Sequence, residues 1–156
     1  MHQHTADTAE LPFPPPFVFL TFLLVGAILS ALFPINLLTI APRLILGVGL
    51  VAIGFYIASR AFREMTLAHT PIDPFEPTTA LVTNGPYRFS RNPIYLSLSL
   101  AYLGIAVALN AAWAVVLWPI MLITLTQVIV VREEKYLEAK FGEAYTQYKS
   151  KVRRWI

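Results

Sequence analysis

The sequence has no cysteine, and only 13% of its 156 residues are charged. Without cysteine the chain has no disulfide, no thiolate metal ligand and no cysteine nucleophile. A soluble domain of this length has about a quarter of its residues charged, because charged side chains keep its surface hydrated. Hydrophobic residues make up 56% of the chain, and the mean hydropathy is +0.61. The composition therefore predicts an integral membrane protein.

Charged residues are missing altogether between Arg91 and Arg132. One helix needs about 20 residues to cross the hydrocarbon core, so this stretch predicts two membrane helices joined by a tight turn. Two earlier hydrophobic segments predict two more helices. A backbone amide left unpaired in lipid costs several kcal/mol, and the segments lack the alternating pattern of a barrel strand. We therefore predict an all-α integral membrane protein with about four transmembrane helices, at residues 17–33, 44–62, 94–109 and 112–131.

These helices belong to one predicted membrane domain, residues 17–156, which follows an N-terminal tail of residues 1–16. The tail has no basic region and no small-residue cleavage site, so we do not expect a signal peptide. Its prolines are expected to stiffen the approach to the first helix, and His2 and His4 are interpreted as ordinary terminal residues. Three glycines of the second helix either let another helix approach closely or are ordinary small residues: Gly47, Gly49 and Gly54.

Basic residues are distributed unevenly along the chain. Of the twelve Lys and Arg residues, only Arg43 lies between the first two hydrophobic segments, four surround the loop of residues 63–93, and seven follow the fourth segment. The positive-inside rule therefore predicts that both termini and this loop face the cytoplasm, as expected in a bacterial inner membrane. Topology and anionic lipid headgroups explain the net charge of +3, so we expect membrane lipids and no nucleic acid as partners.

One long polar stretch, residues 69–95, lies before the third helix and reads HTPIDPFEPTTALVTNGPYRFSRNPIY. Its five prolines prevent a long helix, and Asn84-Gly85 predicts a turn. A long ordered loop in so small a protein is more often functional than not. The stretch brings Arg91, Asn92 and Pro93 to the start of the third helix, where free backbone amides suit a carboxylate or phosphate.

The second polar stretch, residues 132–156, predicts an amphipathic C-terminal helix at the membrane interface. One face of it carries Leu137, Phe141, Tyr145 and Tyr148. Gly142 interrupts this pattern and marks either a break or a close contact. Glu133 and Glu134 lie where the fourth helix leaves the membrane, and such carboxylates need partners, for example an ammonium, a sulfonium or Arg91.

The two polar stretches together carry a family resemblance. GPYRFSRNPIY, followed further along by REEKYLEAKFGEAYTQYKSKVRRW, resembles the isoprenylcysteine carboxyl methyltransferase family. More narrowly, the pattern is similar to the short prokaryotic members, which are related to phospholipid N-methyltransferases. The resemblance covers residues 63–156, and the first two helices match only as hydrophobic segments. It implies an S-adenosylmethionine-dependent methyltransferase that holds its cofactor in a membrane helical bundle, which fits the absence of a glycine-rich dinucleotide fingerprint.

The resemblance also implies which residues bind the cofactor. They are Thr79, Ala80, Leu81, Val82, Tyr87, Asn92, Pro93, Ile94, Tyr95 and Glu133. Many members have His where this chain has Asn92, which can donate a hydrogen bond to the methionyl carboxylate but cannot carry a charge. The candidate catalytic residues are Arg132, the nearest counterpart of a substrate-carboxylate arginine, and Glu134, a candidate base beside His69 and Glu133. No metal is implied.

The implied acceptor is a lipophilic small molecule or lipid that offers a carboxylate, a thiol or an amine. An anionic acceptor needs no base, whereas a neutral amine does. Two alternatives stay open. A related membrane sterol-reductase fold has a similar Arg-x-Pro-x-Tyr segment and binds NADPH, although this chain is short for it and lacks a basic cluster for a 2′-phosphate. The other alternative is a non-catalytic membrane protein. The acceptor and the oligomeric state are not determined by the sequence.

Overall fold

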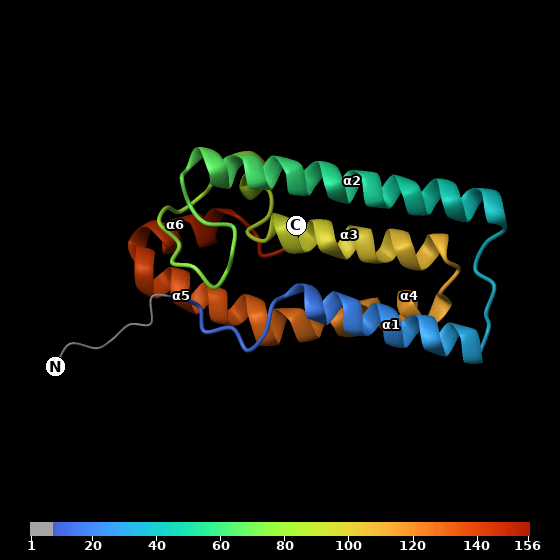
Figure 1. Ribbon diagram of the computed structural model, residues 1–156. Coiled ribbons are helices and arrows are strands. Elements are labelled where there is room, and N and C mark those ends of the chain that lie inside the picture. The colour runs from blue at the N-terminus through green and yellow to red at the C-terminus, as the bar shows by residue number, and fades with distance from the viewer. Residues whose placement is uncertain (1–7) are drawn as a thin grey trace.

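The computed structural model describes residues 8–156, so His2 and His4 of the expected tail lie outside the described residues (Figure 1). The described residues form helices and loops without a strand, which confirms the all-α prediction for this part of the chain. The six α-helices are α1 (Pro16–Leu32), α2 (Ile40–Leu67), α3 (Pro93–Ala108), α4 (Ala112–Leu125), α5 (Val131–Phe141) and α6 (Glu143–Lys151). Two short turns are also helical, the 3₁₀ turn η1 (Gly85–Arg88) and the π turn η2 (Thr126–Val130).

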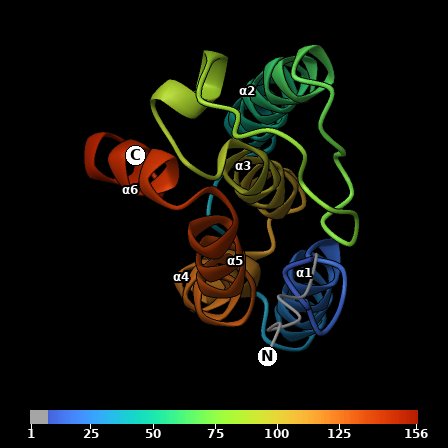
Figure 2. The same ribbon diagram turned by 90° about the vertical axis from the view of Figure 1, so that its left-hand side faces the viewer.

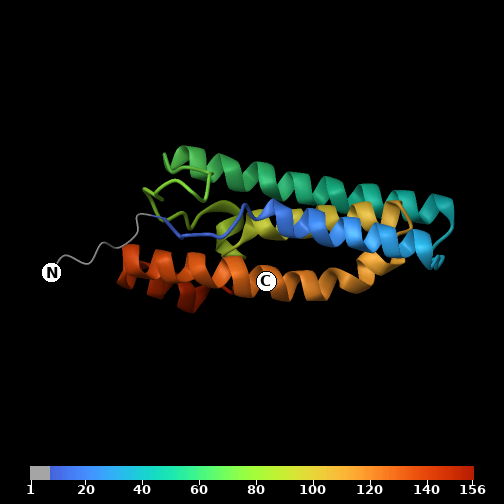
Figure 3. The same ribbon diagram turned by 60° about the horizontal axis from the view of Figure 1, so that its bottom comes forward.

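Helices α1 to α4 run alternately up and down as a bundle (Figures 1 and 3). Helix α2 packs mainly on α3, and α1 packs on α4. Seen from the end, α3 lies between α2 and the α4–α5 helix (Figure 2). The loop of residues 68–92, helices α5 and α6, and the chain before α1 all gather at one end of the bundle (Figure 1). The polar stretches of the sequence therefore meet in space.

Two continuous helices are long and apolar enough to cross a membrane. They are Ile40–Leu67 and Ala112–Phe141, of 28 and 30 residues. Only 11% and 28% of their most apolar windows are buried inside the protein, which distinguishes them from the core helices of a soluble domain. Large apolar side chains such as Ile45 and Phe55 point outward with about three quarters of their surface exposed. Helices α1 and α3 are shorter, with 17 and 16 residues, so a four-span topology stays a prediction.

Helix α2 is longer than the 44–62 segment expected from hydropathy. At 1.5 Å per residue it extends for about 42 Å, more than the roughly 30 Å of a hydrocarbon core. Its last turns contain Arg60, Arg63 and Glu64, which are good helix formers but are too polar for a hydropathy pattern to include. The helix therefore continues beyond the apolar layer, toward the end of the bundle where the polar segments lie.

The predicted fourth helix also continues past its expected end at residue 131. Helix α4 passes through the π turn η2 directly into α5, and α5 ends at Phe141. Gly142 then adopts a φ of +52°, a conformation that favours glycine, and a Cβ placed there would meet nothing within 4 Å. Gly142 is therefore a break between α5 and α6 and not a close contact.

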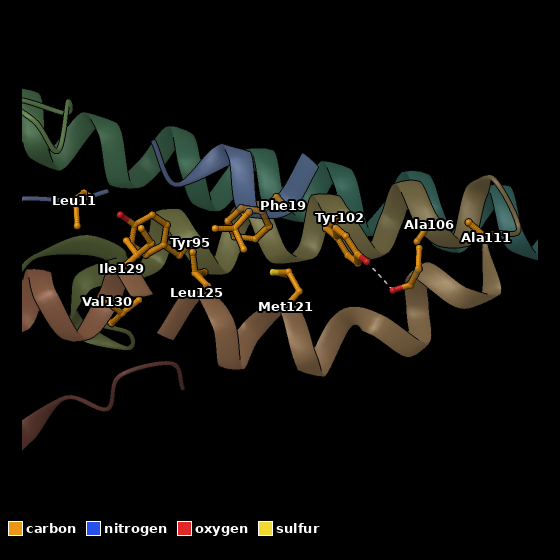
Figure 4. Close-up of a cluster of buried hydrophobic side chains, with 12 residues drawn as sticks. Leu11, Phe19, Tyr95, Tyr102, Ala106, Ala111, Met121, Leu125, Ile129 and Val130 are labelled. Atoms are coloured by element: carbon orange, nitrogen blue, oxygen red, sulfur yellow. Dashed lines mark hydrogen bonds between the residues drawn. The ribbon is translucent and has the colours of Figure 1, made fainter. Parts of the chain in front are cut away.

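The core is a narrow apolar column between α3, α4 and the start of α1 (Figure 4). Met121, Leu125 and Ile129 are fully buried in it. The Tyr102 hydroxyl donates to the Ala114 carbonyl at 2.7 Å, which satisfies both groups inside the apolar column (Figure 4). This column holds α3 against α4 and so fixes where the first turn of α3 lies relative to α5.

Glycines bring α2 and α3 into close contact. A Cβ added at Gly47 would lie 2.6 Å from the Gly104 carbonyl oxygen, and one added at Gly104 would lie 2.6 Å from the Gly47 carbonyl oxygen. A Cβ at Gly54 would lie 2.7 Å from the Ser97 carbonyl oxygen, whereas one at Gly49 would meet nothing within 4 Å. Of the two interpretations that the sequence allowed, close helix packing therefore holds for Gly47 and Gly54, whereas Gly49 is an ordinary small residue.

We expect Gly47→Ala to lower the free energy of unfolding by about 1–3 kcal/mol, because the added methyl group pushes α2 away from α3. Gly49→Ala on the same helix is the control, and it should be at least as stable as the wild type, since its methyl group enters open space and alanine is the better helix former. Thermal unfolding of the detergent-solubilised protein, followed by circular dichroism, measures both. Equal melting temperatures for the two variants would contradict the close packing.

Candidate active site

A cavity of about 440 Å³ lies at the end of the bundle where the polar segments gather. Its wall contains nine of the ten residues that the family resemblance assigned to the cofactor: Ala80, Leu81, Val82, Tyr87, Asn92, Pro93, Ile94, Tyr95 and Glu133. These residues come from the loop before α3, the first turn of α3, and α5. The fold therefore brings sequence segments that lie far apart to one cavity.

Thr79 is the tenth residue, and it has a different place. Its backbone N–H donates to Thr70 Oγ1 at 3.1 Å, and its hydroxyl donates to the His69 carbonyl at 2.8 Å. Among the described residues, its neighbour Thr78 is on the cavity wall and Thr79 is not. The Thr78 N–H donates to the Tyr136 hydroxyl of α5 at 3.1 Å. Thr79 thus holds the loop together, and Thr78 joins the loop to α5.

Tyr95 and Glu133 make a hydrogen bond at the cavity wall. Tyr95, in the first turn of α3, is 9% exposed, and its hydroxyl donates to Glu133 Oε1 at 2.5 Å. Pro93 begins α3, which suits the first helical turn because proline has no N–H to leave unpaired. The bond fixes a carboxylate in the cavity, and an oxygen of such a group accepts strongly from a cationic ligand.

Three consecutive residues of α5 point in three directions. Glu133 is on the cavity wall, Glu134 faces two arginines, and Arg132 is exposed with its Nη1 3.5 Å from the Glu10 carbonyl. A rotation of about 100° per residue separates neighbours on a helix, so adjacent residues cannot share one direction. Among the described residues, neither of the candidate catalytic residues, Arg132 and Glu134, lines the cavity. His69 is exposed and is also outside the wall.

Glu134 holds Arg91 and Arg154 together. Its Oε1 lies 3.1 Å from Arg91 Nη2 and accepts from Arg154 Nε at 2.9 Å, and its Oε2 accepts from Arg154 Nη2 at 2.8 Å. The side chains of Arg91 and Glu134 are each only 8% exposed. The sequence named Arg91 as one expected partner of these carboxylates, and the structure adds Arg154. Bidentate Arg–carboxylate pairs of this kind combine strength with a fixed geometry.

Arg91 also lines the cavity, which the sequence did not predict. Its Nε and Nη1 are buried and have no hydrogen-bond partner, and the Tyr145 hydroxyl is a neighbouring polar group. An unpaired buried donor costs about 1–3 kcal/mol, and more when it is charged. Arg91 therefore brings a positive charge to the cavity wall, which suits an anionic ligand. The position of Arg91 directly before Asn92 and Pro93 is the sequence signal that could have identified it.

Asn92 has a partner that the sequence did not predict. Its Nδ2 donates to the Arg154 carbonyl at 3.0 Å, so this amide donor is directed at the C-terminal segment of the chain. The Asn92 N–H donates to Ser90 Oγ at 3.1 Å. The side chain nevertheless stays on the cavity wall. Donation of the Asn92 amide to a methionyl carboxylate stays a prediction, and the structure adds a role in holding the loop.

Three tyrosines that the sequence did not assign to the site also line the cavity, beside the assigned Tyr87: Tyr136, Tyr145 and Tyr148. The Tyr148 hydroxyl of α6 donates to the Tyr87 carbonyl at 2.7 Å. Burial raises the pKa of Tyr87 and of Tyr148 far above the ordinary value, and burial raises the pKa of Tyr145 to about 12. Their hydroxyl groups are therefore neutral at physiological pH and act as donors or apolar walls, not as bases.

Comparisons with known proteins agree with one another. The family model described as phospholipid methyltransferase matches residues 42–144. The chain is 45% identical to an uncharacterised protein of Haemophilus influenzae over 65 residues, which are 40% of this chain and 100% of that protein. It is 28% identical to the protein-S-isoprenylcysteine O-methyltransferase of Schizosaccharomyces pombe over 106 residues, which are 67% of this chain and 45% of that enzyme. The chain thus spans less than half the length of the yeast enzyme, and no solved structure matches it.

We expect Glu134→Ala to lower the free energy of unfolding by about 3–5 kcal/mol, because it leaves the buried Arg91 without a carboxylate. The control is Glu138→Ala on the same helix. Glu138 pairs with Lys149 at 3.2 Å, but both side chains are more than a third exposed, so this change should cost about 0–1 kcal/mol. Denaturant unfolding in detergent measures both variants. A similar loss of unfolding free energy in the two variants would contradict the larger contribution of the Glu134 ion pairs to stability.

Proposed function

The chain belongs to the phospholipid methyltransferase family, and from this premise we propose that it transfers a methyl group from S-adenosylmethionine to a lipophilic acceptor in the membrane. The relationship to isoprenylcysteine carboxyl methyltransferases that the sequence motifs indicated is confirmed by the family match and the yeast relative. The protein is therefore a membrane methyltransferase by family. The cofactor, the acceptor and the roles of single residues are our proposal.

The observation that carries the proposal is the charge pattern of the cavity. Arg91 places a cation on the wall, and Glu133 places a carboxyl group there that is held by Tyr95. S-adenosylmethionine has a carboxylate, an ammonium and a sulfonium, so a wall with one fixed cation and one fixed carboxyl group is complementary to it. Ala80, Leu81 and Val82 add an apolar surface on the loop side, which suits the adenosine.

The residues of the wall supply orientation and exclude water. When bound, the cofactor supplies a methyl group on a positively charged sulfur, and the reaction is an in-line displacement. Arg91 would hold the carboxylate, and Glu133 would hold the ammonium or face the sulfonium. The buried tyrosines keep water away from the reacting atoms. Most of the rate enhancement then comes from holding the nucleophile and the methyl group in near-attack geometry.

The acceptor side of the cavity is apolar. Phe62 and Met65 of α2, Leu98 of α3, and Pro16 at the start of α1 contribute to it. We propose that a lipophilic acceptor enters laterally between the helices and presents a carboxylate, a thiol or an amine. A carboxylate or thiolate would react without a base. For an amine, Glu133 is the carboxylate on the wall, whereas His69 and Glu134 lie away from it.

The distribution of basic residues supports an orientation. Arg43 belongs to the first turn of α2, at the far end of the bundle, whereas the other eleven Lys and Arg residues follow at Arg60 and later. Those eleven lie on the last turns of α2, in the loop before α3, and from α5 onward, which all meet near the cavity (Figure 1). By the positive-inside rule we propose that the cavity and both termini face the cytoplasm of a bacterial inner membrane.

We expect the detergent-purified protein to bind S-adenosylhomocysteine, the product form of the cofactor, in calorimetric titration. Glu133→Gln should weaken this binding by about tenfold or more, since it removes a charged acceptor in the cavity. Glu138→Gln, on the same helix but exposed, should bind like the wild type. Binding of NADPH in place of S-adenosylhomocysteine would support a reductase, and binding of neither ligand to folded protein would support a non-catalytic role.

We also expect methyl transfer from radiolabelled S-adenosylmethionine into the organic phase of an extract. The assay uses vesicles that contain, in separate samples, a fatty acid, a long-chain thiol or phosphatidylethanolamine, and identifies the acceptor class by the sample that is labelled. Tyr95→Phe should lower the rate by about tenfold or more, because the hydrogen bond that fixes Glu133 is lost. Transfer only to water-soluble acceptors would contradict the lateral path.

A further inference from the structure

The C-terminal segment after α6 returns to the start of α3 (Figure 1). Within this segment Arg154 contacts the site without lining the cavity, among the residues that the structure describes. We propose that Arg154 is a positioning residue of the cofactor site, which holds Arg91 and Asn92 in the geometry that the ligand requires. This inference rests on the proposed function, because it concerns the same cavity and its binding of S-adenosylmethionine.

The side chain of Arg154 sets the orientation of the Arg91 guanidinium, because both arginines bind the same carboxylate. Arg154 occupies both oxygens of Glu134, at 2.9 and 2.8 Å, while Arg91 reaches only Oε1, through Nη2 at 3.1 Å. Arg91 also lines the cavity. Without Arg154, both Glu134 oxygens would be open to Arg91, which could turn to make the bidentate pair itself. The Arg91 guanidinium would then turn toward Glu134 and away from the cavity wall.

The backbone of the same segment fixes the loop before α3. The Arg154 carbonyl accepts from Asn92 Nδ2 at 3.0 Å and from Ser90 Oγ at 3.3 Å. The Arg153 carbonyl accepts from the Arg91 N–H at 3.0 Å. Three successive loop residues are therefore held by two successive residues of the segment. Two of the three, Arg91 and Asn92, are on the cavity wall.

The segment is itself anchored on both sides of Arg154. Trp155 packs against the buried apolar column, and the Val152 N–H donates to the Tyr148 carbonyl at 3.0 Å. The Arg154 guanidinium also has a raised pKa because of its hydrogen bonds to Glu134, so it remains a cation at any physiological pH. Because the segment is anchored at Val152 and at Trp155, the planar guanidinium of Arg154 is suited to hold other side chains in place.

The test is calorimetric titration of the full chain in detergent with S-adenosylhomocysteine, comparing wild type, Arg154→Ala and Arg154→Lys. A positioning role raises the dissociation constant at unchanged stoichiometry, whereas a purely structural role lowers the fraction of sites that bind and leaves the dissociation constant unchanged. We expect Arg154→Ala to weaken binding by about tenfold. Arg154→Lys should bind closer to the alanine variant than to wild type, because an ammonium cannot occupy both carboxylate oxygens as a fork does.

Lys151→Ala is the matched control, because Lys151 is an exposed cation at the end of α6, and it should bind like the wild type. Equal dissociation constants for Arg154→Ala and Lys151→Ala would overturn the proposal, and so would wild-type affinity in Arg154→Lys. If the alanine variant does not fold, the lysine variant alone decides. Failure of the wild type to bind S-adenosylhomocysteine would instead contradict the proposed function, so the two failures are distinguishable.

Discussion

The ion pairs of Glu134 with Arg91 and Arg154 connect three parts of the chain that are distant in sequence. They join α5, the loop before α3 and the C-terminal segment at one end of the bundle. The charges of Arg91 and Glu134 are buried and are stable only when they are paired and hydrogen-bonded, so α5 and the loop depend on each other, and Arg154 ties the C-terminal segment to both. Two of these parts, α5 and the loop, contribute residues to the cavity wall, and its geometry therefore depends on an ion-pair network that lies behind it.

The apolar bundle supplies the rigidity that this network needs. Close α2–α3 packing through Gly47 and Gly104 and the buried column around Met121 place the first turn of α3 opposite α5. The π turn before α5 changes the helical phase just ahead of Arg132, Glu133 and Glu134. Such turns occur often at functional sites because they redirect the side chains that follow. Here Glu133 lies on the cavity wall, whereas Arg132 is exposed at the surface and Glu134 forms the ion pairs.

The proposed methyl transfer would need few catalytic groups. A sulfonium donor already has a good leaving group, so the protein would have to position the reactants, exclude water and balance charge. The chain offers Arg91 and Glu133 for charge and tyrosines for exclusion of water. Asn92, which the family resemblance places where many members have histidine, donates its side-chain amide to the Arg154 carbonyl. A neutral hydrogen-bonding residue is sufficient at a position that holds a loop, whereas an acid–base role would require a titratable one.

The sequence by itself determined that the protein is an all-α membrane protein and which short motifs contribute most of the candidate site, because hydropathy, turn residues and family motifs are local properties of the chain. Only the tertiary structure decided which of three adjacent residues of α5 faces the cavity, and that Arg91 and three tyrosines share its wall. It also showed that Thr79 supports the loop and that Arg154 lies behind the wall. The direction of a side chain after a π turn, and its partners across the bundle, depend on how the helices pack, and no local pattern contains that information.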